Sequence, residues 1–385
     1  MVVNVLISNV YIWKISRILG LFPLFYDDTK NKLKFNHCSW INILLYILLF
    51  FSTRIFLEYR RRNRHQNALE VDSEFFLSST DYDIMSYFFL YYSIIILLHH
   101  WKIMKSLGSL NQFFKKIHIS TEQEANVGTY IRGKALITLI YDSVNILLTI
   151  IIYHLTTSKL SIFKNVSESM YNLMSLAHDI VLSIHPTIMM GYLFLLTTSR
   201  IMFVKVEKWT KKDLDERISS NEMILLEEIR NGYNILSLLK EFNSIMGNLL
   251  SIHAMYLLKS LCMGLYFLIT TSMGISFSYA NALAVFLFIL IVGNIFFKSH
   301  HLHQTGDDIK NLLQEARAQI EKHSVDCVTS QKTQLKVFIF TQRLKDLNYP
   351  LRSSFVPISK EFELSLLLNA FAYCVTFLQF KASEM

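Results

Sequence analysis

Charged residues are scarce in this sequence of 385 residues, because only 18% are Asp, Glu, Lys or Arg. A soluble domain typically carries about 25% charged residues. The charged residues lie between long apolar runs, and 52% of the chain is hydrophobic. A soluble globular protein is therefore excluded, and lipid is the expected environment of much of the chain.

Cysteines and catalytic patterns are also few. The cysteines are Cys38, Cys262, Cys327 and Cys374, far apart in the sequence, and we expect no external disulfide. The first membrane-length run begins near Ser39 after a basic leader, so no cleavable signal peptide is expected. We find no internal repeat and no convincing constellation of acid–base or nucleophilic residues, and we expect neither an enzyme nor a bound cofactor. The net charge of +8 is spread over the segments between apolar runs, which argues against a nucleic-acid partner.

Seven apolar runs are long enough to cross a bilayer as helices, since a hydrocarbon core of about 30 Å needs roughly 20 helical residues. The predicted spans are 39–57, 84–101, 135–155, 180–197, 249–271, 280–297 and 362–380. The expected fold class is therefore all-α, a membrane protein with seven transmembrane helices.

The Lys and Arg residues predict the orientation, because basic residues are retained on the cytoplasmic side during insertion. Segments on the side of the amino terminus hold 29 of them, and the opposite segments hold 7. The amino terminus is predicted to be cytoplasmic and the carboxyl terminus external. The cluster of Arg60, Arg61, Arg62 and Arg64 on the external side argues against this topology. The only Asn-x-Ser/Thr sequon, at Asn165, falls in an external loop and is a candidate glycosylation site.

The long cytoplasmic segments show helical periodicity. Leu225 and Ile229 belong to one apolar series, and Leu335, Phe338 and Leu344 belong to another. We expect spans four, five and six to continue inward as helices that pack together as an anchor region. The predicted units are a leader at 1–38, spans one to four at 39–204, an anchor helix at 205–248, spans five and six at 249–297, anchor helices at 298–361, and span seven with the external terminus at 362–385.

Small and polar residues form a stripe along the last span. Ser365, Asn369, Ala372, Thr376 and Gln379 are spaced 4, 3, 4 and 3 positions apart, so they share one helical face. Such a stripe has to face protein or water, because unpaired polar groups in lipid are costly. The spacing allows two interpretations: packing against neighbouring helices, which is the more general device, and the lining of a pore.

Two charged residues lie within predicted spans at similar depth, Asp142 in the third and Lys259 in the fifth. Charges within a membrane are usually paired or functional, so we expect these two to form an ion pair. His300, His301 and His303 have the spacing of metal ligands, but neither cysteine nor carboxylate accompanies them nearby in the sequence. We expect no metal site there.

The end of the chain carries a recognisable pattern. Positions 373–380 read Tyr-Cys-Val-Thr-Phe-Leu-Gln-Phe. This resembles the signature that closes insect gustatory receptors: a Thr-Tyr pair, five mostly hydrophobic residues, then Gln-Phe. Ala372 stands where the family usually has Thr, and Thr376 places a hydroxyl in the hydrophobic stretch. Chain length, predicted topology, the large inner segment before span seven and the leader at 20–23 are also similar to this family.

The resemblance implies a ligand-gated, largely nonselective cation channel, assembled as a homo- or hetero-tetramer with other gustatory receptors. Four copies of the last helix would surround the pore, and the inner helices would form a shared anchor. Thr376 and Phe380 would lie at the narrowest point, with Gln379 beside them and Tyr373 below. It also implies a location in the plasma membrane of sensory-neuron dendrites and a small-molecule tastant, most often a bitter compound for a divergent member.

The resemblance further implies that the tastant binds in the outer half of the helical bundle, where the sequence places aromatic and hydrogen-bonding side chains. Candidates for ligand contact are Tyr87, Tyr91, Tyr92, Tyr153, His154, His178, Asp179, Tyr266 and Thr270. Aromatic walls with a few polar groups are typical of small-molecule pockets. Tyr and His are equally common as anchors at membrane interfaces.

Two other classes of protein remain open at this point. A G-protein-coupled receptor also has seven spans, but its external amino terminus would oppose the Lys and Arg distribution. In addition, span three lacks an acidic-Arg pair at its end and span seven lacks an Asn-Pro-x-x-Tyr motif. A multi-pass transporter or lipid-modifying enzyme is a weaker alternative. The identity of the tastant is not assigned, because sugar, bitter, carbon dioxide and internal-nutrient sensing all occur in the family that the chain resembles.

Overall fold

Helices make up most of the chain in the computed structural model, which describes residues 17–18, 22–27, 32–67, 79–117, 121–157, 184–210, 222–272, 279–326, 330–353 and 356–383. The helices are α3 (Ser39–Asn67), α4 (Ser79–Lys116), α5 (Thr121–Thr157), α7 (Ile184–Thr210), α9 (Glu222–Ser272), α10 (Tyr279–Asp326), α11 (Gln331–Lys345) and α12 (Lys360–Ser383). A hairpin of β1 (Leu24–Asp27) and β2 (Lys32–Phe35) precedes them. The predicted helical class is confirmed, and this hairpin is an addition to it.

The described parts of all seven predicted spans lie in helices. Among the described residues, four helical stretches are long and apolar enough to cross a membrane: Ile188–Thr210, Glu222–Thr270, Val285–Val325 and Lys360–Gln379. The chain is therefore a helical membrane protein, while its number of spans and its orientation stay predictions.

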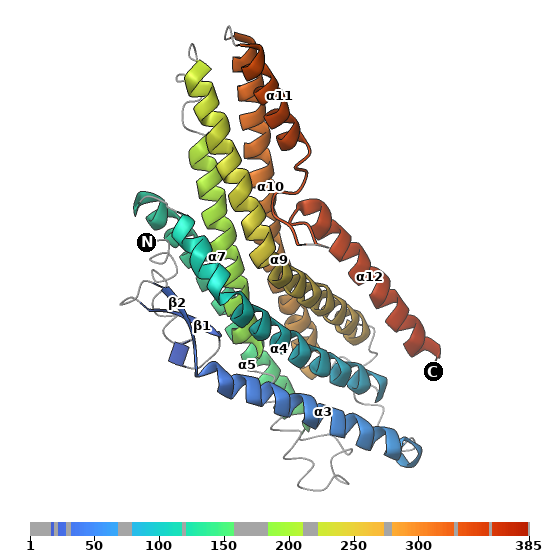
Figure 1. The fold of residues 1–385 in the computed structure, drawn as a ribbon. Coiled ribbons are helices and arrows are strands. Elements are labelled where there is room, and N and C mark those ends of the chain that lie inside the picture. The colour runs from blue at the N-terminus through green and yellow to red at the C-terminus, as the bar shows by residue number, and fades with distance from the viewer. Residues whose placement is uncertain are drawn as a thin grey trace.

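Two helices are far longer than a bilayer requires. α9 has 51 residues and α10 has 48, which at 1.5 Å per residue is about 75 Å and about 70 Å. Each runs without a break from a predicted span into the adjoining inner segment, as the periodicity indicated. α7, α9 and α10 pack against one another, and α11 packs against α10 and α9 (Figure 1).

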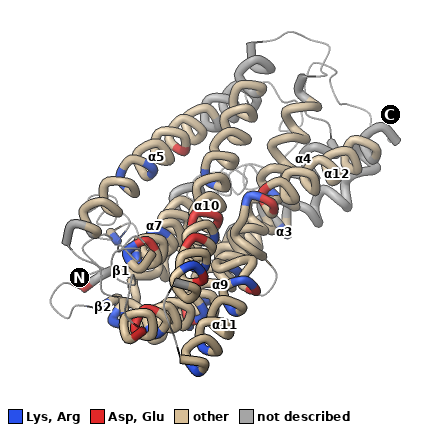
Figure 2. Tube along the Cα trace, turned by 90° about the horizontal axis from the view of Figure 1, so that it is seen from above, with Lys and Arg blue, Asp and Glu red and all other residues tan. Residues whose placement is uncertain are grey.

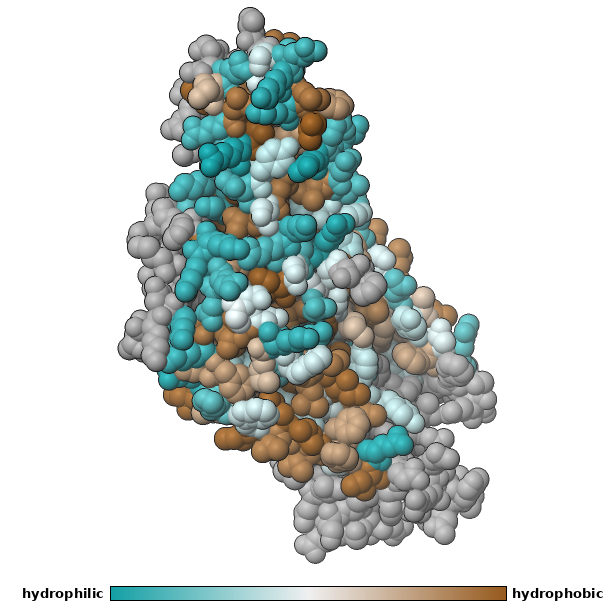
Figure 3. All heavy atoms as spheres, in the orientation of Figure 1, coloured by the Kyte–Doolittle hydropathy of each residue, from teal (hydrophilic) through white to brown (hydrophobic). Residues whose placement is uncertain are grey.

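The long helices divide the molecule into a charged end and an apolar end. Charged residues gather where α7, α9, α10 and α11 come together (Figure 2). On the face drawn in Figure 3, the charged end, at the top, is mostly hydrophilic, and the apolar end, at the bottom, is mostly hydrophobic. An apolar end of this kind suits contact with lipid, while the anchor region outside the membrane stays a prediction.

The charged end has a core of its own, formed by one face of each helix. Leu225 and Ile229 of α9 are buried there, as the periodicity predicted, together with Phe340 and Leu344 of α11. Leu335 and Phe338, placed by the sequence in the same apolar series as Leu344, are 58% and 59% exposed. The buried face of α11 instead runs through Val337, Phe340 and Leu344, which are spaced like successive turns of a helix.

The hairpin docks on α4 through the side chain of Asn111. Its amide accepts a hydrogen bond from Leu33 N at 2.8 Å and donates one to Leu33 O at 3.0 Å. Phe22, just before β1, is buried, and its ring lies 5.3 Å from that of Phe194 in α7. The end of the leader is thus part of the folded structure.

The connection from α11 to α12 is tied to both long helices. Asn243 of α9 donates a hydrogen bond to Pro350 O and accepts one from Arg352 N, each at 2.9 Å. Tyr349 donates a hydrogen bond to Glu361 at 2.8 Å, and this bond raises the pKa of Tyr349. On α10, Asp307 accepts a hydrogen bond from Lys360 N at 3.0 Å. These contacts fix where α12 begins.

The histidine cluster of α10 lies beside this connection. His300 Nδ1 is 3.6 Å from Glu363 Oε2 in the first turn of α12, a carboxylate that is distant in the sequence. His301 Nε2 lies 2.8 Å from Lys134 Nζ of α5, and Ser299 Oγ lies 3.2 Å from His303 Nδ1. Each of the three imidazoles therefore has a different polar neighbour. Within the described ranges, no group of three or more His, Cys, Asp or Glu residues could hold a metal ion.

A buried ion pair joins α5 to α10. Lys298 Nζ lies 3.0 Å from Asp142 Oδ1, and Asn294 donates a hydrogen bond to the same oxygen at 2.5 Å. The predicted pairing of Asp142 with Lys259 is therefore wrong. The reason is that α5 packs against α7 and α10, whereas Lys259 lies on α9 with its ammonium 3.3 Å from the ring centroid of Tyr91.

Replacing one member of this pair tests its contribution to stability. We expect Asp142→Asn to lower the free energy of unfolding by about 3–5 kcal/mol, because the Lys298 ammonium would remain buried without its counter-charge. Thermal unfolding of the purified protein in detergent measures the loss. The matched control is Glu321→Gln, which breaks the more exposed Arg317–Glu321 pair (2.8 Å) and should cost at most about 1 kcal/mol. Equal unfolding temperatures for the two variants would contradict the buried pair.

The close approach of Ile358 to Gly306 gives a second stability prediction. A Cβ at Gly306 would collide with the carbonyl oxygen of Ile358, so we expect Gly306→Ala to cost about 1–3 kcal/mol by forcing the connection away from α10. Gly108→Ala in α4 is the control, because nothing lies within 4 Å of a Cβ there and alanine favours a helix by about 1 kcal/mol. Thermal unfolding of the two purified variants in parallel should show a lower unfolding temperature than that of the original protein only for Gly306→Ala. A lower unfolding temperature for Gly108→Ala than for Gly306→Ala would refute the contact.

Candidate functional site

α12 is held to the rest of the chain along one side only. Leu366, Ala370 and Cys374, spaced 4 and 4 positions apart, are buried, and the helix packs against α9 and α10. Only 17% of the most apolar part of the stretch Lys360–Gln379 is buried. Figure 1 shows α12 diverging from the bundle of long helices. Most of its surface is therefore uncovered within one chain.

The stripe of small and polar residues lies on this uncovered side. Ser365, Asn369, Ala372, Thr376 and Gln379 are all exposed. Asn369 donates a hydrogen bond to Ser365 O at 2.8 Å, and Thr376 donates one to Ala372 O at 3.0 Å. These two side chains thus bond to their own helix. The stripe does not pack the helices of this chain together, which leaves contact with another chain or with water.

The stripe is flanked by apolar and aromatic side chains that are also uncovered. Leu364, Leu368, Phe371 and Val375 form a second row at helical spacing, and each is between 48% and 62% exposed. Tyr373 is 53% exposed and lies on the other flank of the stripe by its position along the helix. The side chain of Phe380 lies outside the described residues, although its backbone belongs to α12.

The structure brings two of the predicted ligand residues together, Tyr91 and Tyr92 of α4. The Tyr92 hydroxyl is 2.9 Å from Ser260 Oγ of α9, and Lys259 Nζ lies 3.3 Å from the ring centroid of Tyr91. Both tyrosine side chains are partly buried. The result is an aromatic and polar group between α4 and α9, with a cation held over an aromatic face.

Tyr266, another predicted ligand residue, lies on the path from α9 to α12. It is fully buried, and its ring is 5.9 Å from that of Phe377 in an edge-to-face arrangement. Cys262 and Cys374 belong to the same buried cluster. α9 therefore presents Lys259 and Ser260 to α4 and, one or two turns further on, Tyr266 to the candidate pore helix.

Of the remaining predicted ligand residues, the two that the structure describes, Tyr87 and Thr270, do not join this group. Tyr87 is 59% exposed on α4, and the Thr270 hydroxyl donates to Tyr266 O of its own helix at 3.0 Å. Tyr153 and His154 lie in α5, but their side chains are outside the described residues. Asn165, His178 and Asp179 fall in the segment 158–183, also outside them.

Sequence reasoning missed a buried column of aromatic and imidazole rings below Tyr92. The ring centroid of Tyr256 lies 5.8 Å from that of Tyr92 and 6.1 Å from that of His253. The His253 ring stacks on Tyr192 of α7 with a centroid distance of 5.8 Å. The signal was available on α9, where His253, Tyr256 and Ser260 are spaced 3 and 4 positions apart and share one helical face. Their partners on α4 and α7 required the fold.

Comparison with known proteins reveals a likeness of structure. The insect olfactory receptor OR5 from Machilis hrabei in complex with eugenol matches with a TM-score of 0.70 and 12% sequence identity, over 96% of this chain and 97% of that chain. A second structure of that receptor matches with a TM-score of 0.61 and 13% identity, over the same shares of both chains. No protein-family model and no curated protein matches the sequence. Over nearly its whole length, this chain has the fold of an insect olfactory receptor.

Proposed function

We propose that the chain is an insect chemoreceptor of the gustatory type, a tastant-gated and largely nonselective cation channel. The observation that carries the proposal is the exposed stripe of small and polar residues along α12, turned away from the chain's own bundle. The resemblance of positions 373–380 to the gustatory receptor signature and the olfactory receptor fold support it. The same fold favours a channel over a G-protein-coupled receptor or a transporter, and both matched structures are of one receptor rather than of an enzyme.

A pore requires several copies of the chain, because one helix cannot enclose water. In the proposed homo- or hetero-tetramer, the stripe of each α12 faces the central axis, and the exposed row of Leu364, Leu368, Phe371 and Val375 packs between neighbouring copies. The exposed apolar residues of α11, Leu335 and Phe338, offer a second surface for contact between subunits. Large exposed apolar patches of this kind usually mark interaction sites.

The gate is placed at the end of the stripe. Thr376 and Phe380 form the narrowest point, with Gln379 beside them and Tyr373 on the flank. A ring of Phe380 side chains closes the resting pore, because a narrow apolar constriction excludes water and therefore ions. The Ser365, Asn369 and Ala372 positions keep the rest of the pore wettable.

The tastant binds between α4, α9 and the neighbouring helices of each subunit, where Tyr91, Tyr92 and Lys259 lie together. The OR5 structure with eugenol supports a small-molecule ligand for this fold. Tyr266 transmits the conformational change caused by tastant binding to the gate, because its ring contacts Phe377 of α12. A bitter or other contact chemical is the proposed class of ligand.

The proposed location is the plasma membrane of sensory-neuron dendrites, with a cytoplasmic amino terminus, an external carboxyl terminus and a glycan on Asn165. Epitope tags at both termini, detected on intact and on permeabilised cells, test this orientation. Only the carboxyl-terminal tag should be accessible on intact cells, and an accessible amino-terminal tag would contradict the topology.

Truncating the proposed gate residue should open the resting pore. We expect Phe380→Ala to raise the current in the absence of ligand severalfold, because the apolar ring that excludes water would be lost. Whole-cell recording from cells that express the protein, alone and with candidate co-receptors, measures this leak. Phe286→Ala is the matched control, since this exposed phenylalanine belongs to α10 and not to the proposed pore helix. An unchanged leak in Phe380→Ala at normal surface expression would remove Phe380 from the gate.

Removing one hydroxyl tests the ligand site. We expect Tyr92→Phe to raise the half-maximal tastant concentration about fivefold, because a buried hydrogen bond contributes about 1 kcal/mol and the ring is retained. Calcium imaging with the most active compound of a tastant panel gives the dose response. Tyr87→Phe on the exposed side of α4 should leave it unaltered. A larger shift for Tyr87→Phe than for Tyr92→Phe would place the tastant elsewhere.

A further inference from the structure

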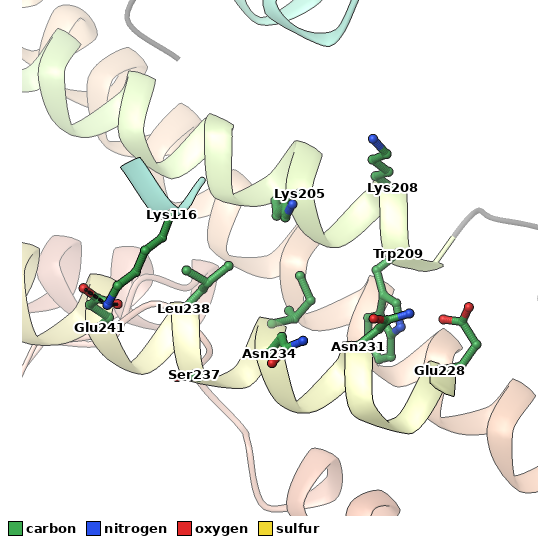
Figure 4. A pocket seen from close by; sticks show the side chains of 11 residues that line it. Lys116, Lys205, Lys208, Trp209, Glu228, Asn231, Asn234, Ser237, Leu238 and Glu241 are labelled. Carbon is green, nitrogen blue, oxygen red and sulfur yellow. Dashed lines mark hydrogen bonds and ion pairs between the residues drawn. The ribbon is translucent and has the colours of Figure 1, made fainter. Parts of the chain in front are cut away.

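An open cleft of about 590 Å³ lies at the charged end of the molecule, between α7 and α9 (Figure 4). Its walls come from the last turns of α7, from α9 and from the end of α4. The lining residues are Lys116, Lys205, Lys208, Trp209, Glu228, Asn231, Asn234, Ile235, Ser237, Leu238 and Glu241. Neither the proposed pore nor the proposed tastant site uses any of them.

The α7 wall of the cleft is rich in hydrogen-bond donors. Lys205 lies between the two helices, whereas the side chain of Lys208 extends from α7 away from α9 at the rim (Figure 4). Trp209 is 94% buried, and its indole N–H has no hydrogen-bond partner among the described residues. An indole nitrogen can only donate, so the buried Trp209 N–H requires an acceptor, and the positive charges of Lys205 and Lys208 favour an anion in that place.

The α9 wall offers acceptors as well as donors. Asn231 and Asn234 face α7 in Figure 4, and Glu228 lines one end of the cleft. At the other end, both carboxylate oxygens of Glu241 accept hydrogen bonds from Lys116 Nζ, at 2.8 and 2.9 Å. Amide groups both donate and accept, and carboxylates only accept. A simple anion would offer no donor to Glu228 and the two asparagine side chains.

We propose that this cleft binds a phosphorylated polyol. The phosphate oxygens accept hydrogen bonds from Lys205, Lys208 and Trp209, and the hydroxyl groups of the polyol donate to Glu228 and the two asparagine side chains. The volume falls within the range of small-molecule sites, roughly 300–1,000 Å³. Lys208 reaches the phosphate by swinging over the rim, since a lysine side chain is a flexible four-carbon stem.

Two sources supply this chemistry. Lys205 lies about 12 Å beyond position 197, the predicted inner end of span four, at a rise of 1.5 Å per residue. That distance allows the headgroup of a phosphorylated inositol lipid in the adjacent leaflet to enter the cleft. It also leaves the cleft open to a soluble inositol phosphate.

Binding of a labelled probe tests the site without any channel recording. The probe is fluorescein-labelled inositol 1,4,5-trisphosphate, and fluorescence polarisation is measured with the purified full-length protein in lipid nanodiscs. We expect saturable binding, weakened at least tenfold in the double variant Lys205→Gln/Lys208→Gln. The matched control is Lys240→Gln/Lys332→Gln, which removes the same charge at exposed positions that do not line the cleft. Trp209→Phe should weaken binding while the aromatic ring is retained.

The competitors identify the ligand and its source. Loss of probe binding when the protein's own nanodiscs contain phosphatidylinositol 4,5-bisphosphate, but not when they contain phosphatidylserine at equal charge, supports the lipid headgroup. Displacement of the probe by unlabelled inositol trisphosphate, with no effect of the inositol lipid in the nanodiscs, supports the soluble source. Equal competition by inorganic phosphate, equal loss in both double variants, or no saturable binding would overturn the proposal.

Discussion

Polar groups inside a bilayer must find partners within protein or water, and this constraint explains the arrangement of the whole chain. Asp142, Lys298 and Asn294 meet it by pairing in the interior. The Tyr92 hydroxyl meets it through Ser260 Oγ of α9, at 2.9 Å. The stripe of α12 is exposed within one chain, and in the proposed tetramer further copies of the chain would enclose it around water.

α9 connects the three proposed functional regions in one continuous helix of 51 residues. Its first half lines the polar cleft and carries the hydrogen bonds of Asn243 to the connection before α12. Its second half presents Lys259 and Ser260 to α4 and Tyr266 to Phe377 of α12. A close-packed helix of this kind transmits a displacement along its length rather than absorbing it. Ligands at either half can thus bias the position of the same pore helix.

The sequence predicted features that depend on spacing along one helix, and it failed where the neighbours of a helix decide. Apolar runs located the helices, and the spacing from Ser365 to Gln379 predicted a shared face that the structure turns outward. The predicted partner of Asp142 was wrong, because the similar depth of Asp142 and Lys259 in their spans does not reveal that α5 packs on α10. Leu335 and Phe338 lie outside the core because several apolar positions of α11 compete for one buried face. Tyr87 and Tyr92 share a helix, but only Tyr92 faces α9.

The accessibility of α12 to water is the most direct test of the account. Cysteines are introduced singly along α12, in a background with Cys38→Ser, and a membrane-impermeant, positively charged thiol reagent is applied while the channel is active. The account predicts that current is lost for Asn369→Cys, Ala372→Cys and Thr376→Cys, and retained for Leu364→Cys and Leu368→Cys. Modification of the leucine row with the stripe untouched would contradict a pore lined by α12.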